Sequence, residues 1–298
     1  MKITRRDVLK AGVAAGLAGA VGCSTSKEPD PAPERWTSRT TPPMPSVYLS
    51  HGSPMEALAK DDYAAALAAF GGRVKPDAIV IISAHYLAPA PVRVTTSAKP
   101  ETIYDFGGFP KKLYEVVYPC PGHPALANEI VAMLRDSGLH AEAEAERGLD
   151  HGSWVPLRLS YPEATTPIVT VSLPALMEPT DLVELGRQLA PLRTKGVMLI
   201  GSGGLVHNFQ ARTKGDQPES WAADFEAWVM ERARALDARA LTDYREKAPN
   251  AELAAPTTEH FDPIFVALGA AKQGDTLKEI FTGFRKNDFS LKCFSVES

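Results

Sequence analysis

Four short apolar runs, rich in β-branched residues, predict buried strands over residues 46–49, 78–82, 168–171 and 197–200. Runs of this length without polar alternation are typical of strands covered on both faces of a sheet. Apolar residues at helical spacing predict helices over 61–70, 125–137, 181–192, 220–236 and 258–271. Because strands and helices alternate, we expect an α/β fold. It should be one three-layer α/β/α domain around a central mixed, mostly parallel sheet.

The first residues predict an export signal and not a part of this fold. Residues 4–10 read T-R-R-D-V-L-K, and a small-residue apolar run follows over 11–22. This pattern resembles a twin-arginine (Tat) signal, with a poor Sec signal as the alternative. The run is shorter than the ~20 apolar residues of a transmembrane helix, so no transmembrane span is expected. Residues 20–24 resemble a lipobox without its usual Leu, and lipidation of Cys23 would anchor a periplasmic or exported protein to a membrane.

We place the signal at residues 1–23. A flexible tether and one large folded domain should follow it. Residues 24–44 are rich in Pro, Ser, Thr and charge, which predicts a flexible segment. Residues 45–298 then form the folded domain. Its composition is ordinary for a globular protein, and a net charge of −4 with no basic stripe argues against a nucleic-acid partner. No CxxC pair is present, while Cys120 and Cys293 could form one disulfide or stay as two thiols.

Three of the seven histidines lie just after predicted strands. His51 follows the first strand, His85 follows the second, and His207 lies in the glycine-rich turn after the fourth. In open α/β sheets, ligands bind outside the carboxyl ends of the strands. A single histidine is more often structural than a ligand, but this shared placement indicates a common site.

Two further histidines occur in segments that suit a site. His151 lies in a loop flanked by glycines, and His260 opens the last predicted helix, where Thr257 or Thr258 can cap it. Neutral imidazole is the commonest metal-ligand side chain, and three protein ligands with an open position are typical of catalytic metal sites. The two remaining histidines, His123 and His140, are expected to be exposed.

Other catalytic motifs are weak or absent. No GxSxG elbow and no HExxH motif occur. The glycine-rich residues 201–204 could cradle an anion, but no Lys-Ser/Thr follows, so they are not a P-loop.

Seven segments of this chain, in order, resemble the LigB superfamily of extradiol ring-cleaving dioxygenases, and most closely its DODA-type (4,5-DOPA) branch. They are L-S-H-G-S-P-M (49–55), S-A-H-Y (83–86), Y-D-F-G-G-F-P-K-K-L-Y (104–114), Y-P-C-P-G (118–122), L-D-H-G-S-W (149–154), G-S-G-G-L-V-H-N (201–208) and P-T-T-E-H-F (256–261). The resemblance implies a LigB-like catalytic domain with a metal held by His51, His85 and His260. It makes His207 either a further ligand or an acid/base, and it makes His151 a group that contacts dioxygen or the catechol hydroxyl.

The implied activity is the opening of a catechol-type, DOPA-like ring by dioxygen at one divalent metal, Zn(II) or Fe(II). The usual iron triad has two histidines and a carboxylate, whereas the nearest acid in this sequence is Glu259. A zinc-dependent hydrolase and a non-catalytic periplasmic metal- or aromatic-binding protein are the alternatives. Tyr86 departs from the tryptophan usual in the family, and the aromatic residues of 104–109 could form either a lid or a packed anchor.

Overall fold

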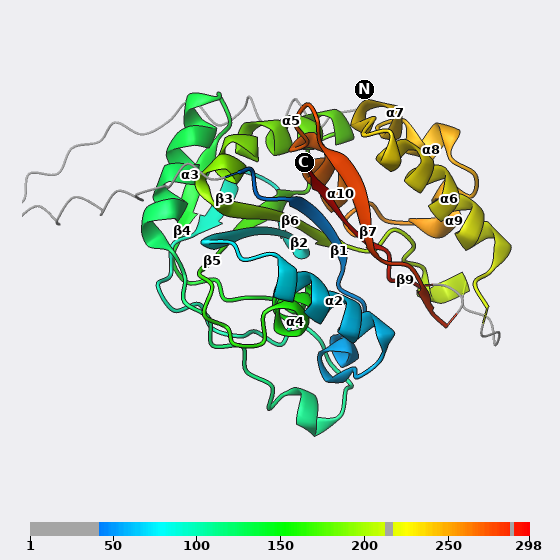
Figure 1. Ribbon diagram of the computed structural model, residues 1–298, viewed down its shortest axis with the longest axis horizontal. Coiled ribbons are helices and arrows are strands. Elements are labelled where there is room, and N and C mark those ends of the chain that lie inside the picture. The colour runs from blue at the N-terminus through cyan, green and yellow to red at the C-terminus, as the bar shows by residue number, and fades with distance from the viewer. Residues whose placement is uncertain (1–41, 212–216, 287–288) are drawn as a thin grey trace, which may run out of the picture.

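The computed structural model of the protein describes residues 42–211, 217–286 and 289–298 (Figure 1). The predicted signal, the lipobox and most of the predicted tether fall within residues 1–41 and so lie outside the described residues. The first described strand begins at Ser46.

The centre of the protein is an eight-stranded mixed sheet in the order β4-β3-β5-β2-β6-β1-β10-β7. Its strands are β1 (Ser46–Ser50), β2 (Ala78–Ala88), β3 (Val92–Thr95), β4 (Ala141–Glu144), β5 (Ile168–Pro174), β6 (Val197–Gly203), β7 (Thr276–Phe281) and β10 (Cys293–Glu297). The four neighbours β5, β2, β6 and β1 run parallel, while β10 and β7 are antiparallel to the strands beside them. Short strands β8 (Phe284–Arg285) and β9 (Phe289–Ser290) pair separately.

Helices cover both faces of this sheet, which confirms the predicted α/β class (Figure 1). On one face lie α2 (Asp62–Arg73) and α4 (His151–Ser160). On the other face lie α3 (Pro124–Asp136), α5 (Pro179–Leu189), α6 (Ser220–Arg234) and α10 (Pro263–Gly269), with the short α7 (Ala238–Leu241), α8 (Tyr244–Lys247) and α9 (Ala251–Ala254). Short 3-10 turns are η1 (Pro54–Leu58), η2 (Lys111–Leu113), η3 (Ala190–Lys195) and η4 (Phe209–Ala211).

Alternate side chains of the central strands belong to two separate apolar cores. In β2, Val80 and Ile82 pack on the α5 and α10 side, while Ile79 and Ile81 pack on the α2 and α4 side. All four are fully buried. A strand that is buried on both faces presents side chains to two apolar cores, which explains the nearly continuous apolar runs in the sequence.

The structure corrects three predicted elements. Strand β2 extends six residues past the predicted end at 82, so His85 lies within it. His151 is the first residue of α4, whereas a loop was predicted. The last helix begins at Pro263 and not at 258, so His260 lies in the turn before it. Proline fits the first turn of a helix but not its interior, which explains the late start.

Both cysteines of the predicted domain, Cys120 and Cys293, are buried free thiols. Among the described residues, no helix has the length and apolar character that crossing a bilayer requires.

Candidate metal centre

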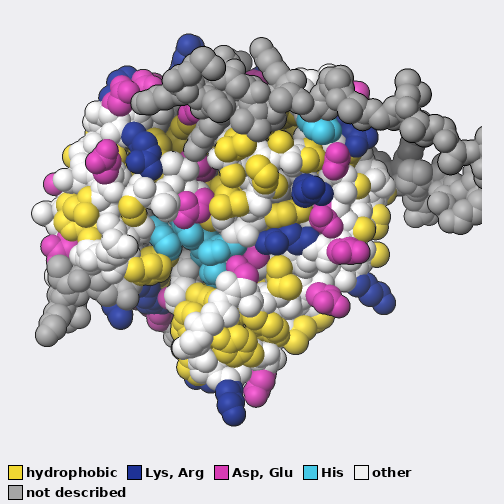
Figure 2. Space-filling view, turned by 180° about the vertical axis from the view of Figure 1, so that it is seen from behind, with side chains coloured by type: hydrophobic (Ala, Val, Ile, Leu, Met, Phe, Trp, Pro, Cys, Tyr) yellow, Lys and Arg dark blue, Asp and Glu magenta, His cyan; other side chains and the backbone are white. Residues whose placement is uncertain are grey.

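Histidines from distant parts of the chain meet at the carboxyl edge of the parallel strands. His51 directly follows β1, His85 lies near the end of β2, and His207 follows β6. Together with His151 and His260 they line one cavity of about 590 Å³. Figure 2 shows histidine side chains gathered in a hollow of the surface, with charged side chains beside them. The structure therefore brings together all five histidines that the sequence singled out.

A break in the β2–β5 ladder turns His85 toward the site. Ser83 pairs with Ser172, but the next paired residue, Leu87, faces Leu173, so three residues of β2 bulge out of the ladder. The backbone groups of His85 find other partners: its N–H donates to Ser83 Oγ at 3.1 Å, and its carbonyl accepts from Arg147 Nη2 at 2.9 Å. The bulge lets His85 turn its side chain toward the site while its backbone N–H and carbonyl stay hydrogen-bonded.

The start of α4 fixes His151 next to His85. Asp150 caps this helix by accepting from Ser153 N at 3.0 Å, and the same oxygen accepts from Ser83 Oγ at 2.7 Å. A Cβ atom on Gly152 would lie 2.4 Å from Ser83 Oγ, so glycine allows the helix to reach β2. The His85 and His151 ring centroids lie 3.9 Å apart as a result.

The glycine-rich end of β6 brings the His260 turn onto the sheet. A Cβ atom on Gly203 would lie 2.0 Å from the His260 carbonyl oxygen, and one on Gly201 would lie 2.2 Å from the Pro263 carbonyl oxygen. The Gly204 N–H donates to the His260 carbonyl at 2.8 Å. These glycines therefore allow the backbone of the His260 turn to approach the end of β6 closely. This role differs from the anion cradle considered for residues 201–204.

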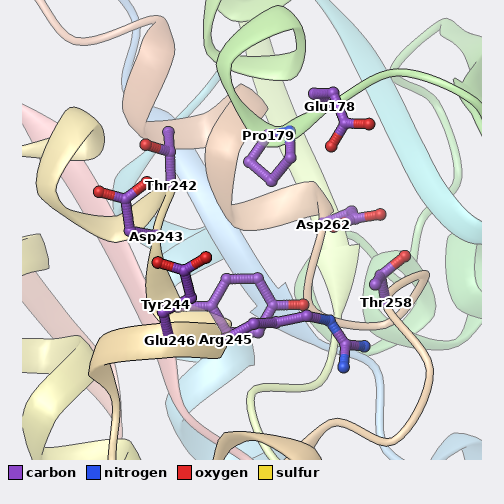
Figure 3. A pocket seen from close by; sticks show the side chains of 9 residues that line it. All are labelled: Glu178, Pro179, Thr242, Asp243, Tyr244, Arg245, Glu246, Thr258 and Asp262. Carbon is purple, nitrogen blue, oxygen red and sulfur yellow. The ribbon is translucent and has the colours of Figure 1, made fainter. Parts of the chain in front are cut away.

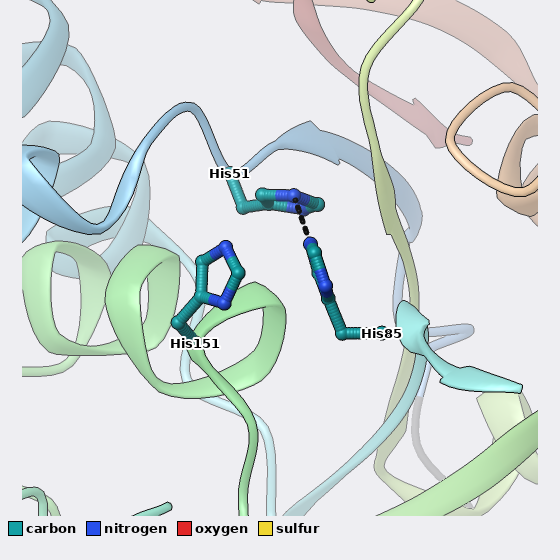
Figure 4. Close-up of side chains that lie close together, drawn as sticks. All are labelled: His51, His85 and His151. Carbon is teal, nitrogen blue, oxygen red and sulfur yellow. Dashed lines mark hydrogen bonds between the residues drawn. The ribbon is translucent and has the colours of Figure 1, made fainter. Parts of the chain in front are cut away.

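His85 Nε2 lies close to two other imidazole nitrogens of the cavity. His85 Nε2 lies 3.1 Å from His51 Nε2 and 3.3 Å from His260 Nε2. Two nitrogen ligands at ~2.0–2.1 Å from a tetrahedral metal lie about 3.4 Å apart, which matches this spacing. His51, His85 and His151 form a second possible ligand set, since each offers a nitrogen and these atoms all lie within 4.8 Å of one another. Figure 4 shows the rings of these three residues directed toward one another.

The Nδ1 atoms of His51 and His260 face acceptors, which favours the tautomer with an unprotonated Nε2. His51 Nδ1 lies 3.0 Å from Ser202 Oγ, whose own proton is donated to the Gly152 carbonyl. His260 Nδ1 lies 3.1 Å from Glu259 Oε1. An Nδ1–H that donates outward leaves Nε2 as a bare lone pair. Lone pairs in contact repel one another unless a cation lies between them, so these residues fit a divalent metal.

Burial keeps His51, His85 and His207 neutral, and a histidine must be neutral to bind a metal. Desolvation, reinforced by neighbouring histidines, holds the pKa of His51 well below its usual value and lowers the pKa of His85 to about 2. Burial and the adjacent His260 lower the pKa of His207 to about 3. Neutral imidazole is the form that binds metal.

His207 and His151 have different surroundings from the three converging rings. The His207 ring is stacked on His260, with centroids 3.6 Å apart and planes within 8°. His151 Nδ1 lies 3.0 Å from Asp105 Oδ2, and its backbone N–H donates to Asp105 Oδ1 at 2.9 Å. Stacking places the face of His207, and not its lone pair, against a neighbouring ring.

Asp105 is a site residue whose role the sequence did not indicate. Its Oδ2 also lies 3.4 Å from His85 Nδ1, so one carboxylate contacts two of the histidines. Burial raises the pKa of Asp105, but hydrogen bonds from His151 outweigh this and lower it to about 2. Its position between Tyr104 and Phe106 in an aromatic segment was the one available signal. Phe106 packs against His151 with ring centroids 5.6 Å apart, so this segment forms part of the cavity wall.

A second hollow, of about 310 Å³, contains no histidine (Figure 3). It lies between the start of α5, α8 and the turn before α10, and carboxylates dominate its charge. Its lining residues are Glu178, Pro179, Thr242, Asp243, Tyr244, Arg245, Glu246, Thr258 and Asp262. Among the described residues, the clustered imidazole nitrogens that could hold a metal lie in the other cavity.

Known proteins resemble this chain over most of its length. A family model described as the catalytic LigB subunit of aromatic ring-opening dioxygenase matches residues 40–287. The 4,5-DOPA dioxygenase extradiol of Beta vulgaris is 40% identical over 85% of this chain and 96% of its own. The protein of the same name from Escherichia coli K12 is 38% identical over 76% of this chain and 85% of its own. An uncharacterised E. coli K12 protein of known crystal structure superposes with a TM-score of 0.72 at 31% identity, covering 85% of this chain and 99% of that one.

Proposed function

The chain belongs to the LigB family of aromatic ring-opening dioxygenases, and from this premise we propose that it opens a DOPA-like catechol at a metal held by His51, His85 and His260. The observation that carries the proposal is the position of His85 Nε2, which lies 3.1 Å from His51 Nε2 and 3.3 Å from His260 Nε2 in one cavity. A bound divalent metal would supply coordination of the two catechol oxygens and of dioxygen. The relatives that match most of this chain are named dioxygenases. Their similarity favours this activity over the hydrolase and binding-protein alternatives.

His151 is the proposed acid/base for the catechol hydroxyl. Asp105 accepts the proton of His151 Nδ1, so Nε2 is the atom free to take a proton from the substrate. The carboxylate then stabilises the imidazolium that forms, as an orienting carboxylate does for a general base. In this proposal His207, stacked on His260, is a second group that can donate or accept a proton in the cavity.

Aromatic side chains of the cavity wall would bind the ring of the catechol. Phe106 and Phe109 line the cavity from one segment, and Phe209 and Phe289 line it from two others. Edge and face contacts between aromatic rings favour a planar aromatic ligand, and these side chains also exclude water from the reacting atoms.

Fe(II) is the proposed active metal, and Zn(II) is the competitor. Glu259 holds His260 Nδ1 and is not directed at the converging nitrogens, so the candidate ligands are all imidazoles. Imidazole suits both metals, but only iron has the redox chemistry that dioxygen requires.

Export is a separate proposal that rests on the leader. The twin-arginine pattern and the lipobox-like Cys23 support a Tat-exported protein, anchored to a membrane through a lipid. Labelling with radioactive palmitate in the native host, with Cys23→Ala as the control, tests the anchor. Label that persists in the variant would contradict it.

The test of the activity begins with anaerobic protein. The metal content is assayed, Fe(II) is added, and oxygen uptake is followed with L-DOPA and simple catechols. We expect uptake of one dioxygen per catechol and a yellow ring-opened product. Tightly held zinc with neither iron exchange nor oxygen uptake would contradict the proposal.

A further inference from the structure

Both backbone groups of His85 are held by residues outside the cavity wall. Its carbonyl accepts from Arg147 Nη2 at 2.9 Å, and its N–H donates to Ser83 Oγ at 3.1 Å. Arg147 lies in the loop between β4 and α4 and is not among the described residues that line the cavity. Its link to the candidate metal centre therefore runs through other residues.

These hydrogen bonds close into a circuit through Asp150. Ser83 Oγ donates to Asp150 Oδ1 at 2.7 Å, and Arg147 Nη2 donates to Asp150 Oδ2 at 3.3 Å. Since the same Nη2 also donates to the His85 carbonyl, four hydrogen bonds form a closed circuit that contains both backbone groups of His85. The backbone of His85 cannot turn unless one of these bonds breaks.

Arg147 also compensates the buried charge of Asp150. The Asp150 side chain is 1% exposed, and Arg147 is its ion-pair partner among the described residues. A buried carboxylate without a partner is costly, because it has lost the water that solvated it. Asp150 caps α4 through Oδ1 and pairs with the guanidinium through Oδ2. Loss of Arg147 would therefore disturb the start of α4, where His151 lies, as well as the bulge.

The guanidinium of Arg147 stacks on the bulge itself. Its Cζ lies 4.2 Å from the centre of the Tyr86 ring, and Tyr86 is the last residue of β2 before the ladder resumes at Leu87. Such a cation–π contact is favourable and suits the planar guanidinium. Arg147 thus holds two successive bulged residues, His85 by a hydrogen bond and Tyr86 by stacking.

We propose that Arg147 is a positioning residue for the candidate metal ligand His85, whose ring direction it sets through this circuit. The proposal rests on the proposed function, in which His85 binds the metal. His85 Nε2 lies 3.1 Å from His51 Nε2, so a turn of the His85 backbone changes the distance between two ligand atoms. Replacing a residue that orients a metal ligand typically lowers metal affinity roughly 10–100-fold.

The first test measures metal binding by the full-length protein. Wild type and Arg147→Met are titrated with Zn(II) and with Co(II) against a chelator. We expect Arg147→Met to bind both metals roughly 10-fold or more weakly. The visible absorption bands of bound Co(II) depend on its coordination geometry, and we expect them to shift in this variant. Unchanged affinity together with unshifted bands would overturn the proposal.

Arg147→Lys tests for rescue by the conservative variant. Its affinity should lie between those of wild type and Arg147→Met, because an ammonium still compensates Asp150 but lacks the planar fork that reaches two acceptors and stacks on Tyr86. It also carries the comparison if Arg147→Met does not fold. Affinity of Arg147→Lys equal to that of a folded Arg147→Met would contradict the proposed circuit.

Arg232→Met is the matched control. Arg232 in α6 donates from Nη1 to the Trp228 carbonyl at 2.9 Å and to Glu231 Oε2 at 3.1 Å, and its Cζ lies 3.7 Å from the centre of the Trp228 ring. Its side chain is 28% exposed, as that of Arg147 is, and it is not among the described residues of the cavity wall. We expect Arg232→Met to bind metal as wild type does. Equal losses in Arg232→Met and Arg147→Met would reveal a general effect on stability and overturn the proposal.

A measurement on the metal-free protein separates failure of this proposal from failure of the proposed function. Histidine labelled with 13C at ring Cε1 gives an NMR signal for each of the seven imidazoles, and His85→Asn identifies the His85 signal by its loss. We expect this signal to move in Arg147→Met and to stay in place in Arg232→Met. That result supports the positioning role even if wild type neither binds metal nor turns over a catechol. A His85 signal that is the same in wild type and Arg147→Met overturns it even if catechols are turned over.

Discussion

His85 is the histidine on which the candidate metal centre depends most, because its Nε2 faces both His51 and His260. Replacing His85 or His51 by alanine removes one of three converging ligands. We expect either variant to lose stoichiometric metal binding, as measured by metal analysis after dialysis. His140→Ala, at an exposed histidine far from the cavity, is the control. Metal content equal to that of the wild type would refute the ligand assignment.

His151 and His260 are both close enough to His85 to compete for the third ligand position. We assign His260 as the ligand and His151 as the acid/base, because Asp105 orients His151. His151→Ala should therefore keep its metal while turnover slows by roughly 10²-fold or more. His260→Ala should lose the metal. Metal analysis and oxygen uptake on both variants decide the matter, and the opposite pattern would exchange the two roles.

At the scale of elements, the sequence predicts the central strands well. It predicts poorly the bulge and the helix start that orient the site histidines. The runs that became β1, β2, β5 and β6 are apolar because both of their faces are covered, and that pattern is local. The bulge at His85 has no local signal, since it is set by Arg147, a residue 62 positions away. Helix α4 was missed because glycine and Pro156 obscure its pattern, and the hydrogen bond from Ser83 of β2 to its capping residue Asp150 appears only in the folded chain.

The same limit applies to the site. Strand ends and glycine-rich turns locate the histidines, because parallel strands share one carboxyl edge. The partners that fix the tautomers, Ser202 and Asp105, lie 151 and 46 positions from the histidines they contact, so only the folded chain reveals them.

Asp150 joins α4 to β2, and its replacement tests whether that junction holds the site. Asp150→Ala removes the cap of α4 and leaves Ser83 Oγ without its acceptor. We expect a loss of about 2–3 kcal/mol in unfolding free energy, measured by urea denaturation. We also expect metal affinity to fall by ~10-fold or more in a chelator competition, because His85 and His151 lose their common support.

Asp237→Ala is the matched control for this prediction. Asp237 also caps a helix, the short and partly exposed α7, by accepting from Ala240 N at 2.9 Å. Its loss should cost about 1 kcal/mol and leave metal affinity unchanged. Equal effects of the two variants on metal binding would show that Asp150 acts only on overall stability.

For the whole molecule, a cluster of neutral buried histidines makes the metal-free protein sensitive to acid. The pKa values of His51, His85 and His207 are lowered in the folded state, so below pH ~6.5 the unfolded chain binds more protons than the folded one. Stability should therefore be full above pH ~6.5 and fall as the pH drops below it. Between pH 7 and 5, each such histidine contributes a loss of up to about 2 kcal/mol.

Urea unfolding in EDTA at pH 7, 6 and 5 measures this slope, and His85→Asn should reduce it. The carboxylates Asp105 and Glu259, whose pKa values are lowered to about 2, add their own loss only at lower pH, as the medium approaches pH 4 and below. Stability that is constant from pH 7 to 5 would contradict the neutral histidine cluster.

The place of β10 in the sheet determines when the protein can fold during its synthesis. This strand is the last of the described strands to be synthesised, yet it lies between β1 and β7 and pairs Val296 with Ser46. Until it arrives, β1 has a bare edge and both apolar cores lack a strand. The sheet is therefore complete only once β10 has been synthesised, and chaperones that shield exposed strand edges should associate with the nascent chain until then.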